Sequence, residues 1–310
     1  MAVSSTFSTI STSGLAPRMQ GLADASLPLT FILLWSTGYV AGKLALPHVG
    51  PFTLLVLRFG LAALVLGLVS WVGRAHWPQR ARDWGHLAVV GLLMQALHFS
   101  GVYYGLRLGL PAGVAGLLIG MMPLATALGA HVWLGERVGR QQLLGLAGGV
   151  LGVALVVAGK APGGGTSAAA VAVTLFGLLG LVAGTLYQKR FCADMDLRSG
   201  ACVQMAVATM AAAALAGPVE GFAVHWHGEL VFAVLWLGLV NSIGAFSLLF
   251  VMVRRGQAGQ VASLFYLIPG VTALLGFALL GERLSPLALA GFAVSALAVL
   301  ACARGRALGR

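Results

Sequence analysis

The segment GVAGLLIGMMPLATALGAHVWLGERVGRQQLLGLAGGVLGV, residues 113–153, has a second, diverged copy in this chain. Shifted by 146 residues it lies on residues 259–299 without a gap, and 15 of its 41 positions are identical. Many of these are Leu, Ala or Gly, which match by chance in so apolar a sequence. The informative identities are a proline, a threonine and a Gly-Glu-Arg corner: Pro123 with Pro269, Thr126 with Thr272, and Gly135-Glu136-Arg137 with Gly281-Glu282-Arg283. We interpret the match as an internal duplication.

The composition around the repeat is that of a membrane protein. Of 310 residues, 59% are hydrophobic and 9% are charged, whereas a soluble domain carries roughly 25% charged residues. Apolar runs of about 18 residues or more, long enough to cross a bilayer core of about 30 Å, recur from Leu27 to Ala303. Because lipid offers no hydrogen-bond partners, these runs must form helices.

We therefore expect an all-α integral membrane protein with ten transmembrane helices. The approximate spans are 27–46, 52–73, 84–106, 111–134, 141–158, 168–187, 200–217, 230–253, 257–280 and 286–303.

The net charge of +11 is explained by topology. If the N-terminus lies inside the cell, fourteen of the nineteen Lys and Arg residues fall in cytoplasmic segments. Basic residues stay on that side during insertion, so both termini are expected to be cytoplasmic. The basic patches are topology signals in this interpretation, and no nucleic-acid partner is expected.

The duplication also predicts the domain organisation. Each copy holds five spans, an odd number, so the second copy enters the membrane from the opposite side. Two inverted five-helix repeats can open a central site alternately to each side. The predicted segments are a flexible cytoplasmic tail (1–26), a first repeat (27–158), a Gly-rich linker (159–167), a second repeat (168–303) and a basic tail (304–310).

Polar and aromatic residues within the spans are candidates for a substrate cavity, because burying an unpaired polar group in the membrane costs free energy. Gln95 and His98 stand out as strongly polar neighbours, three residues apart on one helix face. Each residue taken alone is also explained by an interhelical contact. The cavity candidates are Trp35, Tyr39, Arg58, Gln95, His98, Met121, Met122, Pro123, Asn241, Ser263, Tyr266 and Pro269.

Pro123 and Pro269 lie near the middle of their predicted spans. A proline inside a helix removes one donor and frees the carbonyl four residues earlier. Such freed groups are tolerated in a membrane where they line a cavity or are buried in protein. Both explanations, a cavity wall and a packing kink, stay open.

Two cationic residues, Lys43 and Arg58, are placed in the outer parts of their spans. The default expectation is that both side chains snorkel to the interface. The alternative is that one of them holds an anionic group of the substrate, and Arg58 is the better candidate because it lies deeper.

The eight acidic residues all fall in tails, connections or helix ends. Sodium sites and many proton relays use carboxylates buried in the membrane. The sequence therefore predicts a facilitator or an exchanger, or at most proton coupling through His98.

Several motifs make this chain similar to the drug/metabolite transporter superfamily, specifically to proteins with two EamA-type domains. They are Trp35-Ser36-Thr37-Gly38 with Lys43, Arg58-Phe59, Pro111-Ala112-Gly113-Val114-Ala115 leading to Pro123, Gly184-Thr185-Leu186-Tyr187-Gln188-Lys189-Arg190, and the two Gly-Glu-Arg corners. The resemblance spans about Leu27 to Ala303. It implies ten spans, a central cavity, a bacterial inner-membrane location and export or exchange of small metabolites, often amino acids. We expect the Gly-Glu-Arg corners to form helix hairpins.

A membrane enzyme and a non-transporting scaffold or sensor are the rival functions. A membrane enzyme would need converging catalytic groups or metal ligands, and His98 and His131 lack a carboxylate or cysteine partner on their spans. His225 and His227 share an external connection, but two ligands make a weak metal signal. A non-transporting scaffold or sensor would usually carry a soluble output domain, and no connection is long enough to form one.

The expected partners are a small-molecule substrate and the lipid bilayer, with no metal and no cofactor, in a monomer or homodimer. The three cysteines, Cys192, Cys202 and Cys302, lack metal-ligand spacing and are expected to be free thiols.

Overall fold

The structure of the protein is a computed structural model that describes residues 17–135, 139–159, 167–245, 248, 252 and 267–308. This part of the chain is helical, and its only β-type pairing is an isolated bridge between Val49 and Val224. The helices are α1 (Pro17–Ala45), α2 (Pro51–Val72), α3 (Ala81–Val90), η1 (Gly91–Leu97), α4 (His98–Arg107), α5 (Ala112–Gly120), α6 (Met122–Leu134), α7 (Arg140–Ala158), α8 (Ala168–Phe191), α9 (Leu197–Glu220), α10 (Gly228–Leu235), η2 (Trp236–Ala245), α13 (Ile268–Leu280) and α14 (Pro286–Leu308).

Seven helical stretches of the described chain are long and apolar enough to cross a membrane, namely 27–45, 51–72, 81–107, 112–133, 168–191, 197–220 and 228–245. Three more apolar helices are shorter over their described residues: 143–156, 268–280 and 286–298. Large hydrophobic side chains such as Leu64, Trp71 and Leu179 are more than half exposed, as expected for a surface that faces lipid. The chain is a multi-pass membrane protein.

The internal duplication is visible in the helix boundaries. α6 and α13 have the same bounds once the shift of 146 residues is applied, and α7 and α14 begin at matching positions. α6 and α13 each end at a glycine in the left-handed region, Gly135 with φ +70° and Gly281 with φ +66°. Glycine is favoured there because it lacks the Cβ that penalises positive φ.

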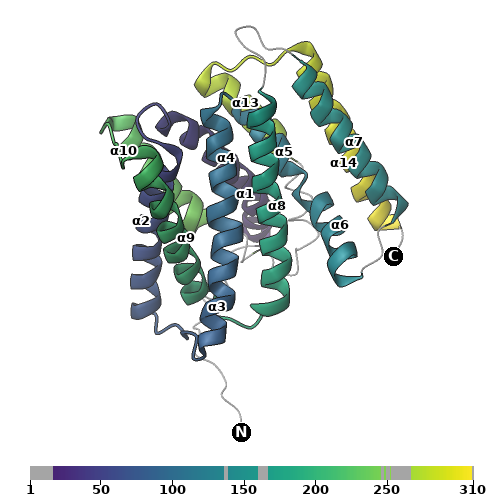
Figure 1. Ribbon diagram of the computed structural model, residues 1–310. Coiled ribbons are helices and arrows are strands. Elements are labelled where there is room, and N and C mark those ends of the chain that lie inside the picture. The colour runs from purple at the N-terminus through teal and green to yellow at the C-terminus, as the bar shows by residue number, and fades with distance from the viewer. Residues whose placement is uncertain are drawn as a thin grey trace.

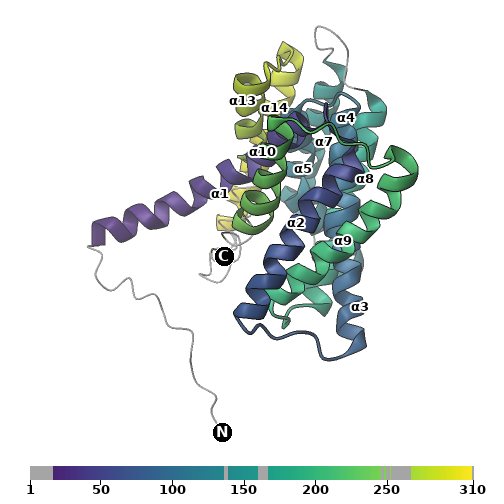
Figure 2. The ribbon, with the colours of Figure 1, turned by 90° about the vertical axis from the view of Figure 1, so that its left-hand side faces the viewer.

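Helices that are far apart in the sequence pack side by side. α2 packs along α9, α7 along α14, and α5 against α13, so each pair joins the first half of the chain to the second (Figure 1). Small residues permit the α5–α13 contact, since a Cβ on Gly113 would lie 2.8 Å from the Cα of Ala273. Seen from the side, the N-terminal part of α1 extends away from the other helices (Figure 2).

The third span of each half contains a π-helix. η1 lies between α3 and α4 in one uninterrupted helical stretch, and η2 follows α10 without a break. The shift of 146 residues places Gln95 of η1 on Asn241 of η2. η1 packs against α8 and α9, while η2 packs against α1 and α2, so each π-helix contacts the first two helices of the other half. π-Helical turns are rare and often occur at functional sites.

The span 112–133 is interrupted at Met121, which separates α5 from α6. Pro123 then occupies the first turn of α6, where a missing N–H costs little. Pro269 occupies the corresponding place in α13. Both prolines thus lie in the first turn of a described helix, and neither lies in a helix interior.

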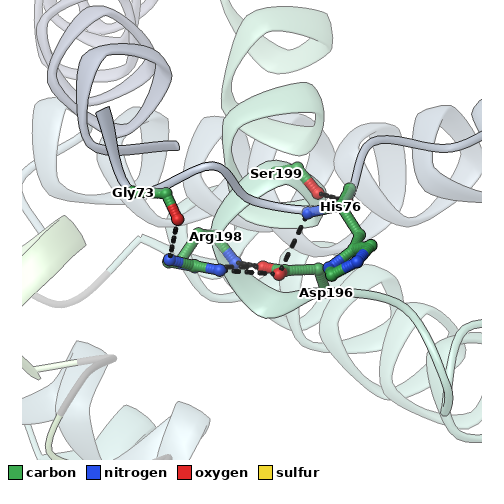
Figure 3. A network of polar contacts seen from close by, with 5 residues as sticks. All are labelled: Gly73, His76, Asp196, Arg198 and Ser199. Atoms are coloured by element: carbon green, nitrogen blue, oxygen red, sulfur yellow. Dashed lines mark hydrogen bonds and ion pairs between the residues drawn. The ribbon is translucent and has the colours of Figure 1, made fainter. Parts of the chain in front are cut away.

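Polar contacts fasten both ends of the α2–α9 pair. At the lower end in Figure 1, Arg198 Nη1 donates to the carbonyl of Gly73 at 3.1 Å, and Ser199 Oγ donates to the carbonyl of His76 at 2.6 Å. Asp196 accepts from the Arg198 side chain and caps α9 by accepting from the Arg198 N–H at 2.9 Å (Figure 3). These contacts tie the α2–α3 connection to the start of α9.

At the opposite, upper end, Glu220 of α9 caps α2. Its carboxylate accepts from the backbone N–H groups of Phe52 at 2.8 Å and Thr53 at 2.7 Å. It also accepts from Thr53 Oγ1 at 2.6 Å. A carboxylate at a helix N-terminus is favourable because it satisfies free donors and complements the helix dipole.

Candidate functional site

A small pocket of about 20 Å3 lies between α1, α2, α4 and η2. This is the space of about one water molecule, below the roughly 300 to 1,000 Å3 of pockets that hold a ligand, so a bound metabolite would require the lining side chains to move apart. It is lined by aromatic, polar and small residues from both halves of the chain: Trp35, Gly38, Tyr39, Arg58, His98, Phe99, Val102, Tyr103 and Asn241.

Arg58 brings a positive charge into this pocket. Its side chain is only 2% exposed. Nε donates to Ser242 Oγ at 3.0 Å, and Nη1 donates to Tyr103 Oη at 2.5 Å. Cζ lies 4.1 Å from the centre of the Phe99 ring, which is within cation–π range. Among the described residues, no carboxylate contacts this guanidinium. The expectation that Arg58 snorkels to the interface is therefore wrong, because its partners hold it inside the bundle.

Asn241 adds an unpaired acceptor to the same pocket. Nδ2 donates to the carbonyl of Leu34 at 2.7 Å, which fixes the orientation of the amide. Oδ1 is buried and has no hydrogen-bond partner among the described residues. Because an unsatisfied buried acceptor costs about 1–3 kcal/mol, a ligand that donates to it would gain affinity.

The close approach of α1 to η2 positions Asn241. A Cβ on Gly38 would lie 2.8 Å from Asn241 Nδ2, so only glycine leaves this space free. Thr37, the residue before Gly38 in α1, accepts a hydrogen bond from Trp236 Nε1 at 2.9 Å through its Oγ1. Ser242 donates to the carbonyl of Leu237 at 2.9 Å, five residues earlier, and accepts from Arg58. Asn241 thus lines the pocket, and the next residue, Ser242, lies outside the lining and accepts from Arg58.

His98 contributes a ring with a defined tautomer. Its Nδ1 lies 3.2 Å from the carbonyl of Gly177 on α8, and since a carbonyl can only accept, Nδ1 carries the proton. In the neutral ring Nε2 is then an acceptor. The ring meets Phe99 edge to face with centroids 4.5 Å apart.

Five of the twelve cavity candidates line this pocket: Trp35, Tyr39, Arg58, His98 and Asn241. Gln95 is buried in η1 with Oε1 unpaired among the described residues, but it lies outside the pocket lining. Met121, Met122, Pro123 and Pro269 also lie outside the lining. Ser263 and Tyr266 fall outside the described residues. A role in substrate binding stays a prediction for all twelve.

Sequence reasoning missed Phe99 and Tyr103, which surround the Arg58 guanidinium. The available signal was their spacing of four residues directly after His98, which places two aromatic rings on one helix face. Lys43 was expected to snorkel as well. It instead pairs with Glu282 and donates to the carbonyl of Leu110 at 3.2 Å.

The family model of the EamA-like transporter family matches residues 25–158 and 168–303. The chain therefore belongs to the EamA-like transporter family, and its two matches correspond to two EamA-like domains. A solved crystal structure of a protein is similar to it with a TM-score of 0.60 and 25% identity, over 90% of this chain and 96% of that chain.

Several relatives are similar over most of their length. The "Probable terminal-alkyne amino-acid exporter" of Streptantibioticus cattleyicolor is 30% identical, over 90% of this chain and 92% of its own. The "Probable amino-acid metabolite efflux pump" of Salmonella typhimurium is 26% identical, over 86% and 90% respectively. The "Uncharacterized inner membrane transporter YedA" of Escherichia coli is 26% identical, over 89% of each chain. The chain is a membrane transporter of small metabolites.

Proposed function

We propose that this protein exports or exchanges a small amino-acid-like metabolite whose carboxylate is bound by Arg58. Two relatives are named for amino-acid export or efflux, which supports this substrate class. The observation that carries the proposal is the buried Arg58 guanidinium at the pocket wall, with no carboxylate partner in the described part of the chain.

The energetic argument concerns the charge of Arg58. An arginine costs about 2.5–3.5 kcal/mol at the centre of a membrane helix on insertion scales, which is an upper bound for Arg58, the eighth of the 22 residues of α2. Hydroxyl partners and an aromatic face reduce this cost but leave the net charge. A substrate carboxylate would neutralise it through charge-assisted hydrogen bonds, which are about twice as strong as neutral ones.

The rest of the pocket suits the other parts of such a molecule. Asn241 Oδ1 is free to accept from a substrate ammonium or amide group. The rings of Trp35 and Tyr39 provide an apolar wall for a side chain. A cation and an unpaired acceptor in one pocket match the two charged groups of a zwitterion.

For the architecture, we propose ten spans arranged as two inverted five-helix repeats, 27–158 and 168–303, which alternate access to the pocket. The pairing of α2 with α9, α5 with α13 and α7 with α14 supports this arrangement, as do the matching π-helices. The distribution of Lys and Arg supports cytoplasmic termini at residues 1–26 and 304–310, with 159–167 as the linker. The proposed location is a bacterial inner membrane.

We propose that transport does not use a sodium gradient. The pocket lining contains no carboxylate among the described residues, and sodium sites commonly use one. Exchange, facilitated export or proton coupling through His98 are the remaining mechanisms. Counterflow that requires Na+ would contradict this part of the proposal.

The test is counterflow in liposomes that contain the purified protein. Labelled amino acids are compared with the corresponding amines, which lack only the carboxylate. We expect saturable exchange of the amino acids and none of the amines. R58Q should lower substrate affinity by about 10- to 100-fold, the equivalent of about 1.5–3 kcal/mol for hydrogen bonds to a charged group. R58K should retain part of the affinity, because it keeps the charge but not the planar fork.

R190Q is the matched control. Arg190 also lies near an aromatic ring, with Cζ 5.5 Å from the centre of the Phe191 ring, but it is exposed and outside the pocket. It should leave counterflow unchanged. Unaltered affinity in R58Q, with amines exchanged as well as amino acids, would overturn the assignment.

A further inference from the structure

Two connections at the upper end of the bundle are joined by backbone hydrogen bonding. The first joins α1 to α2, and the second joins α9 to α10. The N–H of His225 donates to the carbonyl of His48 at 2.9 Å, and Val49 pairs with Val224 in an isolated antiparallel bridge. This pairing holds His48 next to the start of α10.

Three possible metal ligands converge there. The imidazoles of His48 and His227 are stacked with centroids 4.7 Å apart and planes 12° apart. His48 Nε2 lies 3.2 Å from Oε2 of Glu229. One ligand atom from each of the three residues lies within 4.8 Å of the other two. His48 is partly buried, and His227 and Glu229 are exposed, so ions in solution can reach the cluster.

From this geometry we propose a binding site for a transition-metal ion of the Zn2+ class, formed by His48, His227 and Glu229. Zinc bonds to imidazole nitrogen and carboxylate oxygen are about 2.0–2.2 Å long. In a tetrahedral site, ligand atoms are therefore about 3.3 Å apart. The His48–Glu229 separation of 3.2 Å already meets this value. The exposed His227 side chain, whose ligand atom lies within 4.8 Å of the other two, would have to move toward them.

The ligand set determines which ion binds. Two imidazoles and one carboxylate, with a water in the fourth position, suit zinc. Mg2+ and Ca2+ prefer oxygen ligands, so they should not compete. The ion would replace the His48–Glu229 contact and the weak 3.4 Å hydrogen bond from the Glu229 N–H to His227 Nδ1.

The position of the site gives it a mechanical effect. His48 follows α1 in the first EamA-like match, whereas His227 and Glu229 begin α10 in the second. A bound ion would therefore cross-link the two matched regions at their upper end. On the proposed function, in which the two repeats move to open the pocket, this cross-link would slow transport.

Metal binding is measured first, independently of transport. The full-length protein is purified in detergent with a tag that contains no histidine, stripped with a chelator, and titrated with Zn2+ against a chromogenic chelator. We expect about one Zn2+ per chain and a higher unfolding temperature with zinc. H48A and E229Q should each weaken binding by at least about tenfold. H225A is the control, because His225 shares the connection but contributes only its backbone.

H48A keeps the backbone pairing with His225, and E229Q keeps the size of the side chain, so at least one of them should fold. The absence of stoichiometric Zn2+ binding by the wild type would overturn the proposal, as would equal weakening in H225A. Mg2+ should produce neither binding nor stabilisation.

Counterflow with and without Zn2+ then tests the cross-link: we expect slower exchange in the wild type and no change in H48A. If zinc leaves the exchange rate of the wild type unchanged, the cross-link is overturned. If the wild type shows no exchange with or without zinc, the proposed function is overturned instead.

Discussion

The carboxylate of Glu282, in the connection between α13 and α14, forms an ion pair with the ammonium of Lys43 on α1, 239 residues earlier in the chain. The same carboxylate accepts from the Ala112 N–H at the first turn of α5, at 3.0 Å from each oxygen. The Glu282 side chain is 11% exposed and that of Lys43 is 27% exposed. One acidic residue thus joins α1, α5 and the end of α13.

Removing the charge of Glu282 should destabilise the protein. E282Q leaves a partly buried ammonium without its counter-ion, and we expect a loss of about 1–3 kcal/mol in the free energy of unfolding, below the value for a fully buried pair because water reaches Lys43. Thermal unfolding in detergent measures this. R283Q, an exposed neighbour, is the control. The double variant K43Q/E282Q should lose less than the sum of the single variants, and simple additivity would contradict a direct pair.

Glu220 is expected to stabilise α2 through its first turn. E220A removes the acceptor for Phe52 N–H, Thr53 N–H and Thr53 Oγ1. Loss of a helix cap costs about 0.5–2 kcal/mol, and we expect the upper part of that range, measured by thermal unfolding. E229Q in metal-free buffer is the matched control. The exposed Glu229 carboxylate contacts only His48 in the described part of the chain, so its loss should change stability by less than about 0.5 kcal/mol.

Asp196 should make stability depend on pH in the acid range. Burial acts to raise the pKa of its carboxyl, but hydrogen bonds from the Arg198 side chain and from the backbone N–H groups of Arg198 and His76 outweigh this and lower the pKa from 3.8 to about 2. A lowered pKa in the folded state means that stabilisation is complete above about pH 4 and is lost as the pH falls toward 2. We expect D196N to cost about 1–2 kcal/mol at neutral pH.

The difference in unfolding temperature between wild type and D196N should therefore shrink between pH 5 and pH 2.5, values that bracket the ordinary carboxyl pKa of about 3.9. D194N is the control, because Asp194 lies exposed in the same connection. A difference that stays constant over this range would show that Asp196 stabilises the protein by something other than its charge.

Gly38 should be required for transport but not for folding. In G38A the new Cβ meets the Asn241 amide at 2.8 Å, so the amide must shift away from Leu34 and the pocket changes shape. We expect counterflow to fall at least about tenfold, as small displacements in a binding site commonly cause. G60A is the control, because a Cβ there makes an ordinary contact at 3.7 Å with Thr209. Normal counterflow in G38A would show that the α1–η2 contact does not shape the substrate site.

The class of the protein, the position of most spans and the duplication follow from the amino-acid sequence alone. Lipid offers no hydrogen-bond partners, so every spanning segment must be apolar and must form its backbone hydrogen bonds internally. Long apolar runs with few charges therefore predict the spans even when the neighbouring helices are unknown. The helix ends before Gly135 and Gly281 were likewise predictable, because the left-handed conformation of a glycine at a helix end is a local property of the backbone. The motifs that resemble EamA-type domains are short stretches of sequence, so they too are recognised without the tertiary structure.

The partners of the polar residues depend on how the helices pack in three dimensions. Arg58 meets Tyr103 and Ser242, and Lys43 meets Glu282, because helices separated by up to 239 residues pack together with particular rotations. When a helix is apolar on all sides, its sequence has almost no periodic pattern to show which face contacts a neighbouring helix. His48 and His227 come together in the same way, through a backbone pairing between two connections that neither sequence stretch predicts.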